Sequence, residues 1–258
     1  YLFSSASGSD HYMLPAGAAE AGMTYSCVMK PGFWSSFHNQ ALLPFNESLS
    51  FGVNYHNRFM ISELSTRSAG LVIPSGKACL GILYSQAGYK DLMRHMAGVA
   101  CGLRLSEKIS AGIQSDFLTE KSPGENYGKR LITFEVGISI MPSEKIRIGV
   151  HLFNPIPNSL RNILLPSALR AGAGIYLNRL LFASAEAEIS TGGTLNLKTG
   201  FEYERGERFL IRGGFSAENT SFSFGMGYTI KFVQIDLGFT THDRLGISSS
   251  FTMILKLK

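Results

Sequence analysis

The chain has 258 residues, of which 45% are hydrophobic and 17% charged, and its formal net charge is +5 at pH 7. The charged share lies below the roughly 25% of soluble domains, and no uncharged apolar run reaches the ~18 residues of a membrane-spanning helix, which excludes helical spans. Lys and Arg are dispersed without a basic run, so we expect no nucleic-acid partner.

The first segment, residues 1–45, shows no strand periodicity. It contains Pro15, Pro31 and Pro44 together with apolar patches, so it is too apolar for a simple disordered tail. We interpret it as a compact plug for the hollow fold that the rest of the chain predicts. A loosely ordered lead is the alternative. The predicted plug residues include Gly22, Met23, Phe33, Trp34 and Asn39.

From about residue 46 to the end, stretches of about ten residues alternate between apolar and polar or small side chains. The alternation is clear in residues 49–56, 132–140, 145–152, 195–204 and 221–230. A period of two places each set on its own face of a sheet. A soluble β-sandwich would also alternate.

Two further features favour a membrane-spanning barrel over a sandwich. The polar set is mainly Gly, Ser, Thr and Asn with single charges, as a crowded lumen requires, and the pattern continues through nearly every segment without a helix. We therefore predict an all-β fold, a transmembrane antiparallel β-barrel with an N-terminal plug in its lumen.

The predicted connections alternate in length. Tight turns are expected at residues 74–76, 106–107, 142–144, 178–179 and 205–207, and longer links at 121–129 and 154–167. Short periplasmic turns and longer outer loops are typical of outer-membrane barrels, and the segments number about 14, an even number. The last segment, residues 245–258, is expected to pair with the first near Leu49. Residues 1–45 would form the plug, or hatch, and residues 46–258 the barrel.

Charges of both signs fall on the predicted inner face. The candidates for ion pairs in the lumen are Arg94, Arg104, Glu135, Arg170, Glu186, Glu188, Arg212 and Asp236. Because an open ion-selective pore more often has one dominant sign, this near-balanced set predicts a barrel that is closed at rest.

The link at residues 154–167 is apolar for an outer loop. Ile156, Leu160, Ile163, Leu164 and Leu165 form a candidate contact surface for a partner. Alternatively, these residues cap a small ligand site or fold over the barrel mouth.

The cysteines and histidines form no metal pattern. Cys27, Cys79 and Cys101 are widely spaced, and the six His residues are scattered. We expect no metal site, no cofactor and no catalytic set, so the protein is not predicted to be an enzyme. We expect it in the bacterial outer membrane, in contact with its lipid, after removal of a signal peptide that preceded Tyr1.

Several short motifs of the chain are distinctive, namely PAGAAEAGM at 15–23, FHNQALL at 37–43, FNP at 153–155 and LPSALRAG at 165–172. These motifs resemble those of the PorV/PorQ proteins of Bacteroidota, which belong to the wider FadL-like barrels. The chain departs from the family pattern with Thr24-Tyr25 in place of Gly-Gly and with Gln40 in place of Pro. The resemblance implies a barrel of about 14 strands with an N-terminal hatch.

The resemblance implies one of two functions. PorV/PorQ-like barrels are non-enzymatic subunits that hold clients or partners in protein-export or surface-assembly machines, and we favour such a docking role in a complex with other envelope proteins. The alternative is FadL-like transport of hydrophobic small molecules, for which the ligand would be a lipid or resemble a fatty acid.

Overall fold

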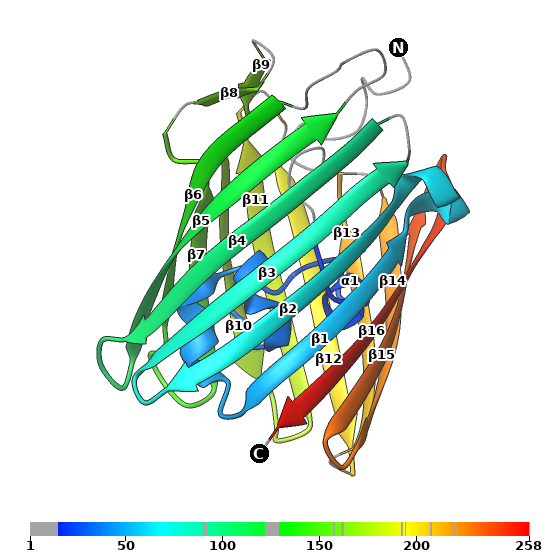
Figure 1. The fold of residues 1–258 in the computed structure, drawn as a ribbon. Helices are drawn as coiled ribbons and strands as arrows, with labels where there is room; N and C mark the ends of the chain where they lie inside the picture. Colours follow the sequence, from blue (N-terminus) through cyan, green and yellow to red (C-terminus); the bar gives the residue numbers. More distant parts are fainter. Residues whose placement is uncertain are drawn as a thin grey trace.

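Antiparallel strands close into a barrel around the N-terminal part of the chain (Figure 1). The computed structural model describes residues 15–89, 92–121, 129–156, 158–160, 163–191, 193, 195–206, 208–218 and 220–257. Around the barrel, β1 to β7 are followed by β10 to β16, and β16 returns to β1. The prediction of a closed antiparallel barrel is confirmed, and the strands number 14.

The strands of the barrel have 8 to 13 residues, and about 9–11 residues suffice for a tilted strand to cross a bilayer. The first seven are β1 (Leu49–Asn57), β2 (Ser65–Ser75), β3 (Ala78–Tyr89), β4 (Leu92–Arg104), β5 (Ile109–Lys121), β6 (Lys129–Ile140) and β7 (Ile146–Phe153). The second seven are β10 (Ala168–Tyr176), β11 (Leu181–Ser190), β12 (Asn196–Arg205), β13 (Phe209–Ser216), β14 (Ser221–Ile230), β15 (Val233–His242) and β16 (Gly246–Leu257). A small separate hairpin, β8 (Asn158–Leu160) and β9 (Ile163–Leu165), lies between β7 and β10.

The barrel closes where its last strand pairs with its first. Leu49 lies opposite Leu257, and the register continues to Asn57 opposite Ser249. Inside this seam, the Asn54 side-chain oxygen accepts hydrogen bonds from the hydroxyls of Ser250 at 3.0 Å and Thr252 at 2.8 Å. Closure leaves no strand edge unpaired, which is the condition for a sheet in lipid.

Side chains alternate between a packed interior and an apolar exterior. Inward positions such as Ser85, Gln114 and Asp116 are almost fully buried, whereas the outward Ile113 and Phe222 are 64% and 58% exposed. An apolar surface that covers the outside of the whole wall is suited to lipid rather than to water. Among the described residues, no helix is long and apolar enough to cross a membrane.

Residues 15–45, which precede β1, lie inside the barrel, where Figure 1 shows them in blue. They form three short helices, α1 (Ala18–Ala21), η1 (Phe33–Phe37) and η2 (Gln40–Phe45). The side chain of Asn39 accepts a hydrogen bond from the Ala41 amide and caps η2. Helix α1 contacts β14, β15 and β16, and η2 contacts β2 to β6, so the segment spans the lumen between opposite walls.

The two ends of the barrel differ. At the lower end in Figure 1, strands are joined by tight turns such as the one at Gly76, whose φ of 62° favours glycine. At the upper end, β1 and β2 are joined through η3 (Arg58–Met60) and η4 (Ser62–Leu64), and β7 and β10 through the β8–β9 hairpin. The upper end is therefore expected to be the outer one.

Candidate functional site

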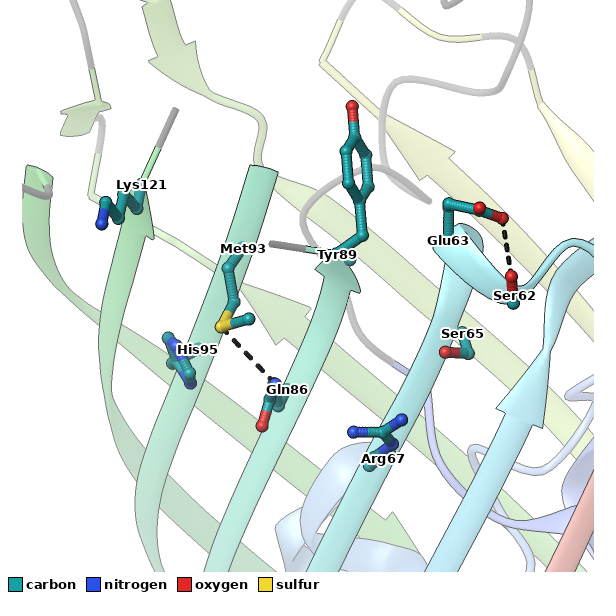
Figure 2. Close-up of a pocket in the computed structure, with 10 residues that line it drawn as sticks. Ser62, Glu63, Ser65, Arg67, Gln86, Tyr89, Met93, His95 and Lys121 are labelled. Atoms are coloured by element: carbon teal, nitrogen blue, oxygen red, sulfur yellow. Dashed lines mark hydrogen bonds between the residues drawn. The ribbon is translucent and has the colours of Figure 1, made fainter. Parts of the chain in front are cut away.

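One cavity of about 510 Å³ lies on the outside of the wall, at the upper end of β2 to β5 (Figure 2). Its strand residues, which include Arg67, Gln86 and His95, alternate with buried inward residues such as Ser68 and Ser85. The cavity therefore lies outside the lumen and off any path through the barrel.

Inside the lumen, glycines allow the N-terminal segment to approach the wall closely. A Cβ atom at Gly149 in β7 would lie 2.1 Å from the carbonyl oxygen of Val28, and one at Gly238 in β15 would lie 2.3 Å from that of Ala18. Gly22 packs on Gly225 in β14, and a Cβ atom added at Gly22 would lie 2.8 Å from the Cα atom of Gly225. A larger residue at these positions would push the segment away from the wall.

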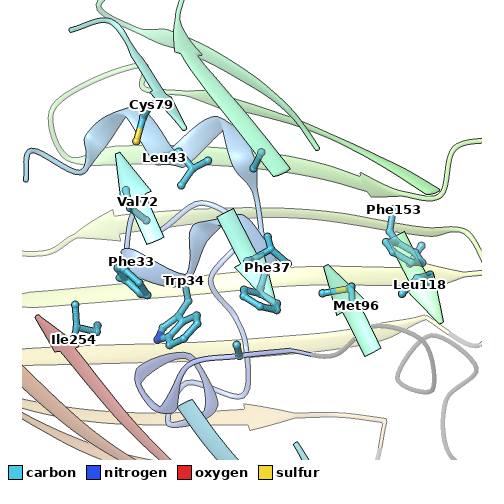
Figure 3. Close-up of a cluster of buried hydrophobic side chains, with 14 of the residues drawn as sticks. Phe33, Trp34, Phe37, Leu43, Val72, Cys79, Met96, Leu118, Phe153 and Ile254 are labelled. Atoms are coloured by element: carbon cyan, nitrogen blue, oxygen red, sulfur yellow. The ribbon is translucent and has the colours of Figure 1, made fainter. Parts of the chain in front are cut away.

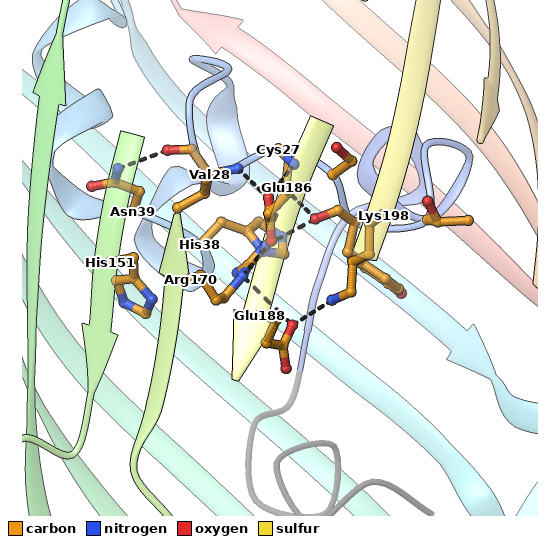
Figure 4. Close-up of polar contacts among 12 residues, drawn as sticks. Cys27, Val28, His38, Asn39, His151, Arg170, Glu186, Glu188 and Lys198 are labelled. Carbon is orange, nitrogen blue, oxygen red and sulfur yellow. Dashed lines mark hydrogen bonds and ion pairs between the residues drawn. The ribbon is translucent and has the colours of Figure 1, made fainter. Parts of the chain in front are cut away.

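A first polar network joins the wall to the backbone of the segment (Figure 4). The Glu186 carboxylate accepts hydrogen bonds from the amides of Cys27 and Val28, each at 2.9 Å, and pairs with Arg170 at 2.7 Å. Arg170 also donates to the carbonyl of Tyr25 at 2.9 Å. Glu188 forms an ion pair with Lys198 beside it. Each buried charge thus has an opposite charge or a backbone dipole as its partner.

A second network is centred on Arg212. Its guanidinium pairs with Glu202 and Asp236, each at 2.6 Å. Glu202 also accepts a hydrogen bond from the ammonium of Lys30 in the segment at 3.0 Å. The second network therefore holds the segment to β12, β13 and β15.

A third network is built on Glu135. Its carboxylate accepts from the side-chain amide of Gln40 at 2.6 Å and contacts the His151 ring at 2.8 Å. The amide of Asn39 donates to the Val28 carbonyl at 2.7 Å and to the Ile138 carbonyl in β6 at 3.2 Å. The position that departs from the PorV/PorQ pattern, Gln40, is thus a contact between segment and wall.

The remaining predicted ion-pair residues lie at the two ends of the barrel. Arg94 pairs with Glu120 near the upper mouth. Arg104 is placed differently from our expectation. Arg104 is exposed at the lower end of β4, and its guanidinium lies 4.7 Å from the centroid of the Phe45 ring. Because the strand ends there, no acidic side chain of the described lumen pairs with Arg104.

An apolar cluster occupies the lumen on the side of β2 to β7 (Figure 3). It begins with Phe33, Trp34 and Phe37 of the segment, whose rings make edge contacts at centroid distances of 4.8 and 5.6 Å. It continues along the inner wall with Val72, Leu83, Met96, Leu118, Leu131 and Phe153 and reaches the hairpin at Leu165 in β9. The hollow beside Trp34 has no room for a water molecule.

The candidate partner surface is only partly described. Ile156 is 65% exposed, whereas Leu165 is 3% exposed and belongs to the apolar cluster. The side chains of Leu160, Ile163 and Leu164 lie outside the described residues, although their backbones form β8 and β9.

Sequence reasoning missed several contacts of the lumen. Lys30, Gln40 and His151 join the networks above, and the sequence predicts none of these three contacts. The inward parity of His151 is a usable signal, but Lys30 and Gln40 lie in a segment without periodicity. Of the described residues, no group of three His, Cys, Asp or Glu side chains could hold a metal ion.

Comparisons with known proteins find similar folds only among solved structures. No protein-family model and no curated protein matches the chain. The monoaromatic hydrocarbon channel CymD is 13% identical, with a TM-score of 0.74, and 95% of this chain and 98% of that chain are covered. The toluene transporter TbuX of Ralstonia pickettii is 13% identical, with a TM-score of 0.73 and coverage of 96% and 100%. A FadL homologue of Pseudomonas aeruginosa is 11% identical, with a TM-score of 0.69 and coverage of 95% and 99%.

At these identities the likeness shows the fold, which is that of FadL-like barrels. The more specific resemblance to PorV/PorQ proteins stays a prediction.

Proposed function

We propose that the chain is an integral outer-membrane barrel that carries hydrophobic small molecules across the outer membrane. The fold is shared with a toluene transporter and a monoaromatic hydrocarbon channel. This was the alternative in our sequence interpretation, and it now has more support than the docking subunit.

The apolar cluster in the lumen is the observation that carries the proposal. The lumen of a water-filled porin is polar, whereas Met96, Leu118 and Leu131 here form one inward row across β4, β5 and β6. The Arg94–Glu120 pair lies one row nearer the upper mouth. A polar entrance followed by an apolar site suits a ligand with an apolar body, such as an aromatic hydrocarbon or a fatty acid.

In this proposal the N-terminal segment acts as the plug. Residues 1–45 would form the hatch and residues 46–258 the barrel, and a ligand would pass when part of the hatch moves. The three networks hold the segment on several sides, so a local shift near Phe33, Trp34 and Phe37 would require less energy than its full release.

A docking role has one observation in its favour, the exposure of Ile156 in the connection from β7 to β10. A single exposed apolar side chain is common on protein surfaces. A complex with other envelope proteins therefore remains the second candidate.

Trp34 offers a direct test because it is the single tryptophan of the chain and lies in the apolar cluster. Titration with bromobenzene or 11-bromoundecanoic acid should quench its fluorescence with saturation. Leu118→Asn, which places an amide in the cluster, should weaken this binding by about tenfold or more, since burying an unpaired amide costs roughly 1–3 kcal/mol.

The control is Thr119→Asn, at the neighbouring outward position of the same strand. It should leave the quenching unchanged. Quenching that rises linearly without saturation, and equally in both variants, would mean simple partition into detergent and would refute the transport site.

A further inference from the structure

A row of polar side chains crosses the outer face of five neighbouring strands. Arg67 lies opposite Gln86, Gln86 opposite His95, His95 opposite Thr119, and Thr119 opposite Arg130. The next outward row toward the middle of the wall is apolar or aromatic and consists of Ala69, Tyr84, Ala97, Phe117 and Ile132. The apolar belt of the barrel therefore ends abruptly on this side.

Three residues of this row, Arg67, Gln86 and His95, line the cavity of about 510 Å³. Figure 2 shows Arg67, Gln86 and His95 along its floor, with Lys121 higher and the β1–β2 connection at its other side. The hydroxyl of Tyr84 is 2.7 Å from Nδ1 of His95, which fixes the ring and leaves Nε2 for another partner. Ser65 and Tyr89 add hydroxyl groups to the lining.

The charges on the outer wall are all of one sign. In the described strands the charged outward positions are Arg67, Lys121, Arg130 and Arg205, and none is acidic. The ion pairs of the described residues lie in the lumen or around Asp243, so Arg67 and Lys121 form no ion pair within this part of the chain. Glu63 borders the cavity, and its carboxylate accepts a hydrogen bond from Ser62 at 2.8 Å.

An arginine on the lipid face of a barrel costs roughly 2–4 kcal/mol at the bilayer midplane and roughly 0–1 kcal/mol near the interface. An anion at the same depth removes this cost. Among the described residues no carboxylate pairs with Arg67 or Lys121, although Glu63 lines the same cavity. An anionic lipid headgroup at this level would supply the counter-charge.

We propose that this groove binds the phosphate group of a lipid in the outer leaflet, with Arg67 and Lys121 as its cationic contacts. His95, Gln86 and Ser65 add hydrogen bonds, and the apolar row below the groove contacts the acyl chains. This inference rests on the proposed outer-membrane location but not on the identity of the transported compound.

The test measures binding of lipid A, a phosphorylated glycolipid, to the full-length chain in neutral detergent by native mass spectrometry. Each basic residue near an anionic lipid surface contributes about 1 kcal/mol, so R67Q/K121Q should weaken binding by about tenfold or more. The matched control is K77Q/R205Q, which removes two exposed charges at the opposite end of the wall and should bind as the parent does.

Two further arms identify the ligand chemistry. The unmodified protein should bind dephosphorylated lipid A as weakly as R67Q/K121Q binds lipid A itself. This measurement does not depend on whether a variant folds. The conservative R67K/K121R should retain binding. Equal binding of the phosphorylated and dephosphorylated lipids would overturn the proposal. Displacement of lipid A by equimolar inorganic phosphate would also overturn it, because it would indicate a site for free anions.

The outcome is separable from that of the transport proposal. The groove lies outside the lumen, so R67Q/K121Q should leave the saturable quenching of Trp34 unchanged. If R67Q/K121Q loses lipid binding but keeps the saturable quenching of Trp34, the inference is supported. If the unmodified protein binds lipid A but shows no saturable quenching, only the proposed class of transported ligand is refuted.

Discussion

At the residue scale, Glu20 is a buried acidic group of the N-terminal segment that forms no ion pair with the described residues. Glu186 and Glu202 have cationic partners, but Oε2 of Glu20 makes no hydrogen bond with the described residues. Glu20 lies in α1, outside the strands, and burial raises its pKa from the ordinary 4.5 to about 7, against the lowering influence of its own backbone and Lys30.

This shift predicts a pH-dependent stability. Between the unfolded pKa of 4.5 and the folded pKa of about 7, the folded protein keeps a proton that the unfolded chain has lost. Stability from this group is therefore full below pH 4.5 and falls as the pH rises toward 7. Glu20→Gln should remove this dependence and stabilise the protein at pH 8 by on the order of 3 kcal/mol.

Thermal unfolding in detergent at pH 5 and pH 8 checks this prediction. The difference between parent and variant isolates Glu20 from the other titrating groups. An identical change in midpoint with pH for both proteins would show that Glu20 does not titrate in this range.

At the element scale, the fit of the N-terminal segment depends on glycines at its contacts with the wall. The strands there present backbone rather than side chains, so α1 lies directly against β14 and β15 at Gly225 and Gly238. The networks of Arg170, Arg212 and Glu135 then fix the position of the segment along the lumen.

Gly238→Leu should displace the segment while the barrel stays closed. Overpacking costs about 1–3 kcal/mol, which predicts a rise of roughly tenfold in the rate of chymotrypsin cleavage after the buried Trp34. Ala173→Leu, at an exposed outward position of β10, should be cleaved as slowly as the parent. Equal cleavage rates for all three proteins would mean that Gly238 does not control the seating of the segment.

At the scale of the whole molecule, the lumen combines buried ion pairs on one side with an apolar face on the other. The apolar cluster lies along β2 to β7, and the networks of Arg170 and Arg212 lie across β10 to β15. Such a lumen is unsuited to a permanent water column, because charged pairs and packed rings occupy it.

In planar bilayers, the full-length protein is therefore expected to show no stable large conductance. Gly238→Leu should show frequent transient openings, since the segment is then less firmly seated. A steady large conductance of the unmodified protein would contradict the closed lumen and make a pore the better interpretation.

Much of the barrel could be predicted from residue order. The period of two assigned Glu186, Arg212 and Asp236 to the inner face because alternation is a local property of each strand. The residues of the N-terminal segment could only be grouped by composition, since neither Lys30 nor Gln40 belongs to a repeating pattern. The short helices α1, η1 and η2 were likewise not predicted.

What the sequence alone determined is the all-β class, the face on which each strand residue lies and the approximate number of strands. Only the tertiary structure decided which atoms meet, such as Glu186 with the amides of Cys27 and Val28, or Arg67 in one row with Gln86 and His95. The reason is physical. Alternation is set within a strand, whereas these contacts depend on the register between strands and on the path of a non-periodic segment through the closed lumen.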